Sequence, residues 1–198
     1  MDSFRTSWLN FAQGLPAGVR NEHLAGSGYN GAMTAPNSPL LHVVLYQPEI
    51  PPNTGNIGRS CVATGCRLWL VEPLGFDISE KAVRRAGLDY WSLLDLRVVP
   101  DWQTLMSELA EPFASGRVWL FTKTAKQNYL QAKYQAGDVL IFGCETRGLP
   151  PEIMAEHSQS LVRIPMRPQV RSLNLAVTAG IAMYEAVRQI GCGPEYFA

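Results

Sequence analysis

The sequence predicts an α/β fold, with a mainly parallel sheet that helices cover on both faces. Short apolar runs rich in β-branched and aromatic residues alternate with segments of helical periodicity, an order typical of parallel sheets. Several of these runs end in glycine- or proline-containing loops that lead into a predicted helix. The 198 residues are 46% hydrophobic and 17% charged, a composition sufficient for one sizeable core.

The predicted strands begin after a glycine- and proline-rich leader. Residues 1–40 have few periodic apolar positions, so we expect them to be disordered, and residues 192–198 form a short tail. The predicted domain therefore spans residues 41–191. Its strands are expected at residues 41–46, 67–71, 96–99, 117–122, 138–142 and 160–165.

Helices are expected between these strands. The last of them carries apolar residues around most of its circumference, so we expect it to be buried nearly all round, inside the fold or against a second subunit. Asp, Asn, Ser and Thr are the residue types that cap helix N-termini. The expected N-caps are, in chain order, Asn53 or Thr54, Ser79, Asp101, and Ser172 or Asn174.

Composition argues against several classes of protein. Seventeen basic residues balance seventeen acidic ones, so only local clusters of charge favour a nucleic acid partner. The four cysteines form no CxxC pair, and neither a metal site nor a disulfide framework is expected. No apolar run reaches the roughly 18 residues of a membrane span. We expect no membrane partner and a cytoplasmic location.

Three loops at strand ends hold the residues best suited to chemistry, because ligands of open α/β sheets gather beyond the carboxyl ends of the strands. PPNTGNIGR (51–59) combines glycines with Arg59, FGCETRGLP (142–150) carries Glu145 and Arg147, and IPMRPQVRSLN (164–174) precedes the last helix. Each also has a simpler interpretation as a capped helix, a tight turn or core packing. The GxGxxG and GxxxxGK[ST] patterns are absent, which argues against ordinary dinucleotide binding and a P-loop.

Positive charge is concentrated in two parts of the chain. Residues 117–171 contain eight basic residues and four acidic ones. The segment KAVRRAGLDYW (81–91) places Arg84 and Arg85 near Tyr90 and Trp91, a mixture of cations and rings that single-stranded RNA recognition uses. The alternative for this segment is a solvated helix with two core aromatics.

In this order, the motifs LYQPEIPPNTGNIGR, KAVRRAGLDYW, FGCETRGLP and IPMRPQVRSLNLA with YEAVRQ resemble those of the SpoU–TrmD (SPOUT) methyltransferases. The likeness covers about residues 41–191 and is greatest to small bacterial tRNA (cytidine/uridine-2'-O-)-methyltransferases of the anticodon wobble nucleotide. It implies a C-terminal deep trefoil knot, a homodimer through the knot helices, and the tRNA anticodon loop as partner. It also implies S-adenosylmethionine as cofactor, S-adenosylhomocysteine as product, and no metal.

The resemblance assigns roles to individual residues. Arg59 matches the motif arginine, and because a guanidinium stays protonated we expect it to hold the target phosphate or hydroxyl rather than act as the base. Asn53 and Glu145 are the other catalytic candidates, and the identity of the base stays open. The implied RNA-binding residues are Arg84, Arg85, Tyr90, Arg147 and Arg171. The implied cofactor-binding residues are Phe121, Thr122, Gly143, Ile164, Ser172, Leu173 and Asn174, with Phe121 and Ile164 against the adenine.

The chain departs from the common family pattern at three positions. Ala176 and Val177 stand where relatives commonly have serine and asparagine, and Cys144 replaces a frequent proline. The first departure concerns target preference or rate more than cofactor binding, because Ser172 and Asn174 remain. Two alternatives stay open: a 2'-O-methyltransferase of ribosomal RNA or of another tRNA position, and a non-catalytic RNA-binding module on the same fold.

Overall fold

The structure is a computed structural model, and it describes residues 38–79 and 88–191. The chain divides into two units, Met1–Met33 and Thr34–Ala198, and every described residue belongs to the second. Nearly all of the expected leader, the tail at 192–198 and the helix expected after Ser79 lie outside the described residues.

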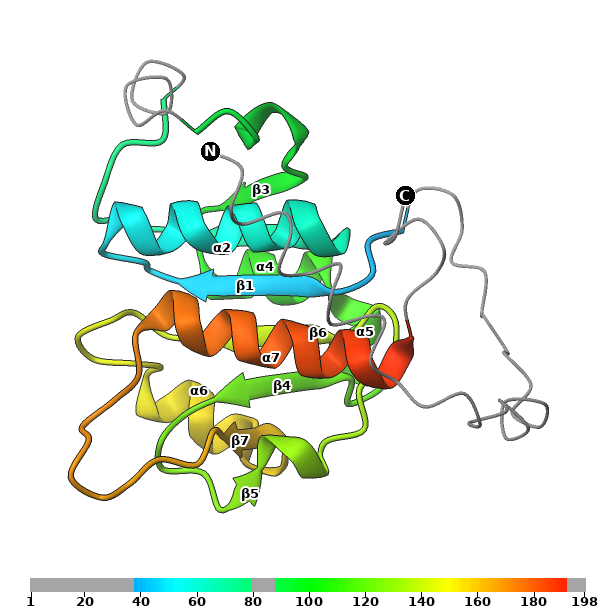
Figure 1. Ribbon diagram of the computed structural model, residues 1–198. Coiled ribbons are helices and arrows are strands. Elements are labelled where there is room, and N and C mark those ends of the chain that lie inside the picture. Colours follow the sequence, from blue (N-terminus) through cyan, green and yellow to red (C-terminus); the bar gives the residue numbers. More distant parts are fainter. Residues whose placement is uncertain (1–37, 80–87, 192–198) are drawn as a thin grey trace, which may run out of the picture. The chain divides into compact units, whose positions relative to one another are not determined.

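A seven-stranded sheet forms the centre of the described part, and all of its pairings are parallel (Figure 1). The predicted parallel sheet is therefore confirmed, with each expected strand present. β5 was not expected, because a polar strand of two residues has no hydrophobic period. In the order β3-β2-β1-β6-β4-β7-β5 the strands are His42–Tyr46 (β1), Arg67–Val71 (β2), Leu96–Val99 (β3), Val118–Phe121 (β4), Gln127–Asn128 (β5), Val139–Phe142 (β6) and Leu161–Arg163 (β7).

Helices cover both faces of this sheet, as predicted. On one face α2 and α7 pack against each other, and α4, α5 and α6 cover the other face (Figure 1). The helices are Pro51–Thr64 (α2), Trp102–Glu108 (α4), Ala110–Ala114 (α5), Pro151–Glu156 (α6) and Leu175–Ile190 (α7), with short 3-10 turns at Trp91–Leu93 (η1), Tyr129–Gln131 (η2) and Ser158–Ser160 (η3). Within the described ranges, no helix has the length and apolar character to cross a membrane.

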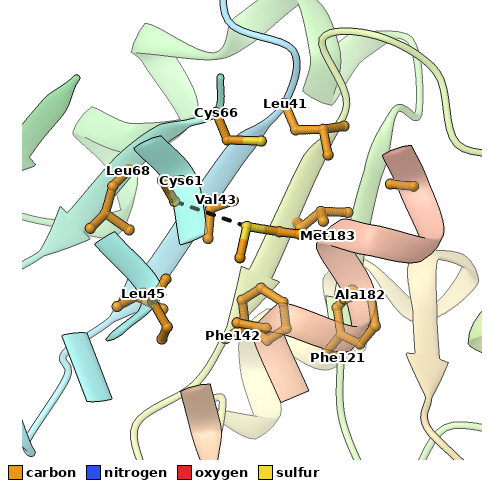
Figure 2. Packing of buried hydrophobic residues seen from close by; sticks show 14 of the residues in the cluster. Leu41, Val43, Leu45, Cys61, Cys66, Leu68, Phe121, Phe142, Ala182 and Met183 are labelled. Carbon is orange, nitrogen blue, oxygen red and sulfur yellow. Dashed lines mark hydrogen bonds between the residues drawn. The ribbon is translucent and has the colours of Figure 1, made fainter. Parts of the chain in front are cut away.

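The alternation of side chains along β1 divides the core into two clusters. Val43 and Leu45 face α2 and α7, where Met183 lies at the centre of the packing shown in Figure 2. Val44 faces the other way, toward Trp102 of α4. Both faces of the central strands are buried, which explains why these strands have continuous apolar sequences rather than alternating ones.

Two helix starts test the predicted caps. Asp101 caps α4 by accepting from the backbone N–H of Thr104 at 2.7 Å, as expected. The prediction for α2 was wrong, because this helix begins at Pro51, and Asn53 and Thr54 lie buried inside its first turns. Proline fits the first helical position, where no intrahelical N–H bond is lost.

The last helix was expected to be buried nearly all round, inside the fold or against a second subunit, and the first of these alternatives was wrong. One face of α7 is buried against the sheet and α2. On the opposite side the side chains of Val177 and Tyr184 are 51% and 57% exposed. Among the residues that the structure describes, α7 therefore has packing partners on one side only.

Candidate active site

A pocket of about 670 Å³ lies at the carboxyl ends of β4, β6 and β7. This volume falls in the usual range of small-molecule sites, about 300 to 1,000 Å³. Its walls come from the segments that follow these three strands. All seven expected cofactor-binding residues line it, namely Phe121, Thr122, Gly143, Ile164, Ser172, Leu173 and Asn174. The structure thus brings together residues that lie up to 53 positions apart in sequence.

The wall that follows β6 folds back on itself with almost no space inside. A Cβ atom on Gly143 would lie 2.1 Å from the carbonyl carbon of Gly148 and 2.2 Å from the backbone nitrogen of Leu149. The backbone N–H of Gly148 donates to the carbonyl of Cys144 at 2.9 Å, and Gly148 has a φ of +73°. Gly143 is therefore required for the close approach within the loop, whereas Gly148 is favoured for its left-handed conformation.

Glu145 joins this loop to the start of α2. Its Oε2 accepts from the backbone N–H of Glu49 at 2.8 Å, and its Oε1 accepts from the backbone N–H of Ile50 at 3.2 Å and from Nδ2 of Asn53 at 2.9 Å. A carboxylate at a helix N-terminus satisfies unpaired N–H groups and interacts favourably with the helix dipole. Glu145 thus replaces the side-chain cap that Ile50 does not supply.

Asn53 continues the connection to α7. Its Oδ1 accepts from Nδ2 of Asn174 at 2.9 Å, and Oδ1 of Asn174 accepts from the backbone N–H groups of Ala176 and Val177 at 2.9 and 3.2 Å. Of the two expected caps of this helix, Asn174 is confirmed. Ala176 and Val177 leave this cap intact, because Asn174 accepts only from their backbone N–H groups and not from their side chains.

Glu49 was not anticipated from the sequence, although it lies in the motif QPEIPPN. Its carboxylate accepts from the backbone N–H of Thr146 at 3.0 Å and from the Thr146 hydroxyl at 2.8 Å. Because Glu145 binds the backbone of residues 49 and 50 in return, the two loops hold each other through a reciprocal pair of carboxylates. The only signal in the sequence was an acidic residue beside each loop, which does not reveal pairing.

Arg59 does not line the pocket. It lies on α2 with a side chain that is 60% exposed, and its guanidinium carbon lies 4.2 Å from the centroid of the Tyr90 ring. Its Nη2 is 3.6 Å from Oδ1 of Asp89. The ring of Tyr90 is buried, at 8% exposure, and its hydroxyl donates to the carbonyl of Gly55 at 2.5 Å. The expected stacking of a base on Tyr90 does not agree with this burial.

Two of the expected RNA-binding residues stand at the pocket. Arg147 and Arg171 line it and are exposed, and neither forms an ion pair with another described residue. Lys123, one of the eight basic residues of 117–171, lines the same pocket. Arg84 and Arg85 lie outside the described residues. Across the described ranges, no three His, Cys, Asp or Glu side chains are grouped so that they could hold a metal ion.

Comparison with known proteins identifies the family. The sequence model of the SpoU rRNA Methylase family matches residues 40–184. A tRNA (cytidine(34)-2'-O)-methyltransferase from Methylovorus glucosotrophus (strain SIP3-4) is 46% identical over 151 residues, which cover 76% of this chain and 96% of the relative.

Solved structures of similar proteins agree with this family assignment. One that concerns the 2-OH methylation of C/U34 on tRNA is 46% identical, with a TM-score of 0.69 over 75% of this chain and 95% of its own. The SpoU methyltransferase AviRb from Streptomyces viridochromogenes, in complex with AdoMet, is 28% identical, with a TM-score of 0.65 over 77% of this chain and 58% of its own. The chain therefore belongs to the SpoU rRNA Methylase family.

Proposed function

We propose that this protein transfers a methyl group from S-adenosylmethionine to the ribose 2'-hydroxyl of the tRNA wobble nucleotide, C34 or U34. One observation carries the proposal: the pocket gathers all seven residues expected to bind the cofactor, in a chain that is 46% identical to a tRNA (cytidine(34)-2'-O)-methyltransferase. A tRNA substrate is consistent with the cytoplasmic location expected from the sequence.

The pocket suits a methyl donor whose surface is partly apolar and partly polar. Phe121, Ile164 and Leu173 offer apolar surface for an adenine, while Thr122 and Ser172 offer hydroxyl groups. The AdoMet complex of the related AviRb supports this choice of ligand. When bound, S-adenosylmethionine supplies an electrophilic methyl carbon on a sulfonium. The protein then has to hold a ribose oxygen in line with that carbon and to let the hydroxyl proton leave to a base or to solvent.

Arg59 is proposed to stabilise the negative charge that develops on the ribose oxygen or to hold the adjacent phosphate. A guanidinium does this as a permanent cation with several donors. Glu145 is proposed to position the site rather than to act as the base, because its oxygens accept from two backbone N–H groups and from Asn53. Asn53 is proposed to have the same positioning role, since it links Glu145 to Asn174 through hydrogen bonds.

A homodimer through α7 is part of the proposal. Val177 and Tyr184 leave apolar surface exposed on this helix, and Arg59 lies outside the pocket of its own chain. A second subunit that packs on α7 is therefore proposed to bring Arg59 and a pocket to one substrate. Co-expressed dimers that combine an Arg59→Ala subunit with a Gly143→Ala subunit test this, because activity returns only if the two sites are shared.

The RNA is proposed to lie over the rim of the pocket. Arg147, Arg171 and Lys123 place positive charge there, and phosphate contacts of this kind position a nucleic acid without reading its bases. The roles of Arg84 and Arg85 in gripping the tRNA remain predictions. Local charge of this kind allows a chain with no net charge to bind RNA.

The family description names ribosomal RNA, so a 2'-O-methyltransferase of another RNA is the second candidate. Transfer of labelled methyl groups to total RNA from a strain that lacks the gene, followed by mapping of the modified nucleotide, separates the two. We expect label at tRNA position 34. Label in ribosomal RNA or at another tRNA position supports the second candidate, and cofactor binding without transfer to any RNA supports a non-catalytic module.

Arg59→Ala tests the role of the arginine. We expect loss of transfer with an affinity for S-adenosylmethionine that stays within about threefold of the parent, because the residue does not line the pocket. Arg97→Ala is the matched control, since Arg97 is an exposed arginine of β3 that also lies outside this pocket. A large loss of cofactor affinity in Arg59→Ala contradicts the proposed role.

A further inference from the structure

Two glycines give α2 a flat face on which the segment of residues 88–94 lies. Gly55 and Gly58 are three positions apart, so they share one side of the helix. A Cβ atom on Gly58 would lie 3.1 Å from Cδ2 of Leu94, and a Cβ atom on Gly55 would lie 3.5 Å from the hydroxyl oxygen of Tyr90. The glycine spacing of PPNTGNIGR therefore makes room for this segment.

Tyr90 is the residue of the segment that is tied to the helix by a hydrogen bond. Its hydroxyl donates to the carbonyl of Gly55 at 2.5 Å. In an α-helix the same carbonyl also accepts from the N–H four residues later, which here belongs to Arg59. Burial raises the pKa of Tyr90, so its hydroxyl stays protonated near neutral pH and acts as a donor.

The ring of Tyr90 lies against the guanidinium of Arg59. The guanidinium carbon lies 4.2 Å from the ring centroid, within the range of a cation–π interaction. The ion pair with Asp89 is weak by comparison, because its atoms are 3.6 Å apart and the side chains are 60% and 83% exposed. A long side chain on an open helix face otherwise samples many rotamers.

We propose that Tyr90 is a positioning residue for Arg59, and this inference rests on the proposed function of Arg59. The buried ring, anchored to α2 at Gly55, holds the guanidinium in one place before the RNA substrate arrives. The Arg59 side chain is then already ordered before the substrate binds. Substrate binding therefore does not have to offset the loss of conformational entropy of this side chain. Tyr90 acts through Arg59, not by stacking on a base.

The first test is a double-mutant cycle on methyl transfer to the RNA that the parent protein modifies. Tyr90→Leu is expected to lower kcat about 2- to 5-fold, with the KM for S-adenosylmethionine unchanged, whereas Tyr90→Phe keeps the ring and loses less than about 2-fold. In an Arg59→Lys background the loss caused by Tyr90→Leu is expected to shrink. Equal losses in the two backgrounds overturn the inference, as does a Tyr90→Phe variant as slow as Tyr90→Leu.

The second test does not depend on activity. In NMR spectra of the parent, the side-chain signals of Arg59 are expected to show the ring-current shift of Tyr90, retained in Tyr90→Phe and lost in Tyr90→Leu. If Tyr90→Leu fails to fold, Tyr90→Met replaces it in both tests. A parent that methylates no RNA contradicts the proposed function, and the NMR result then decides alone whether Tyr90 holds Arg59. An unshifted Arg59 signal overturns the inference even if the protein is active.

Discussion

The substitution Gly143→Ala tests how closely the pocket loops must approach. The added Cβ atom would lie 2.1 Å from the carbonyl carbon of Gly148, 2.2 Å from the nitrogen of Leu149 and 2.6 Å from the carbonyl oxygen of Gly148. Carbon atoms in contact prefer a separation of about 3.5 to 4.0 Å, so the two strands of the loop must separate by more than about 1 Å. All three obstructing atoms belong to the backbone, which cannot rotate away as a side chain can.

The cost follows from this geometry. Overpacking in a well-packed core costs about 1 to 3 kcal/mol, and we expect the upper end here because backbone must move on both sides. For a chain of this size that corresponds to a fall in Tm of about 6 to 12 °C. The displaced wall also holds Glu145 and lines the pocket, so we expect the affinity for S-adenosylmethionine to fall at least about tenfold.

Calorimetric titration with S-adenosylmethionine and thermal unfolding measure both effects. Gly148→Ala is the matched control, because it lies in the same loop and its Cβ atom would meet nothing within 4 Å. Its φ of +73° makes the substitution cost about 1 to 2 kcal/mol, with cofactor affinity kept within about threefold. If Gly143→Ala melts and binds like the parent, the close approach of the two backbones is not a requirement of the site.

Three further predictions concern pH, Glu145 and assembly. Burial, followed by the charge of Arg67, lowers the pKa of His42 from 6.5 to about 4, so between these values the unfolded chain binds a proton that the folded chain does not. The contribution of neutral His42 to the free energy of unfolding is therefore present above about pH 6.5, and about 2 kcal/mol of it is lost by pH 5. Denaturant titrations at pH 7.5 and 5 measure this, and His42→Asn should lose less on acidification; an equal loss in both proteins assigns the effect to other groups. Glu145→Gln should lower the free energy of unfolding by about 2 kcal/mol, because an amide cannot accept from all three donors; unchanged stability with abolished transfer instead identifies a base. Tyr184→Arg should convert dimers to monomers in light scattering, while Leu93→Arg, at a residue 73% exposed and outside α7, should not; a parent that is already monomeric contradicts the proposed homodimer.

Features set by neighbouring residues could be read from the sequence. The strands are short β-branched runs between turn residues, and the parallel sheet follows from their alternation with helices. The caps Asp101 and Asn174 were predictable because each accepts from N–H groups two or three residues further along the chain. The gathering of the seven expected cofactor-binding residues in one pocket was also predictable, since the family resemblance implied it and parallel strands bring their carboxyl ends to one edge.

Features that depend on distant segments could not be read in this way. The start of α2 was misplaced because its N-terminus is satisfied by Glu145, more than 90 residues away. For Tyr90 the sequence allowed either a stacking ring or a core aromatic, and the flat glycine face of α2 that buries it exists only after the chain folds. The sequence placed Arg59 in a loop at a strand end but did not show that α2 presents it outside the pocket, against the ring of Tyr90.

For this protein, then, residue order alone determined the strands, the parallel sheet and two helix caps, while the resemblance to the family implied the residues that meet in the pocket. Only the tertiary structure decided which carboxylate caps α2, which ring supports Arg59 and which side of α7 remains uncovered. The division has a physical cause. Propensity and capping are interactions across a few residues, whereas hydrogen bonds and close approaches between distant loops exist only after the topology has placed their backbones side by side.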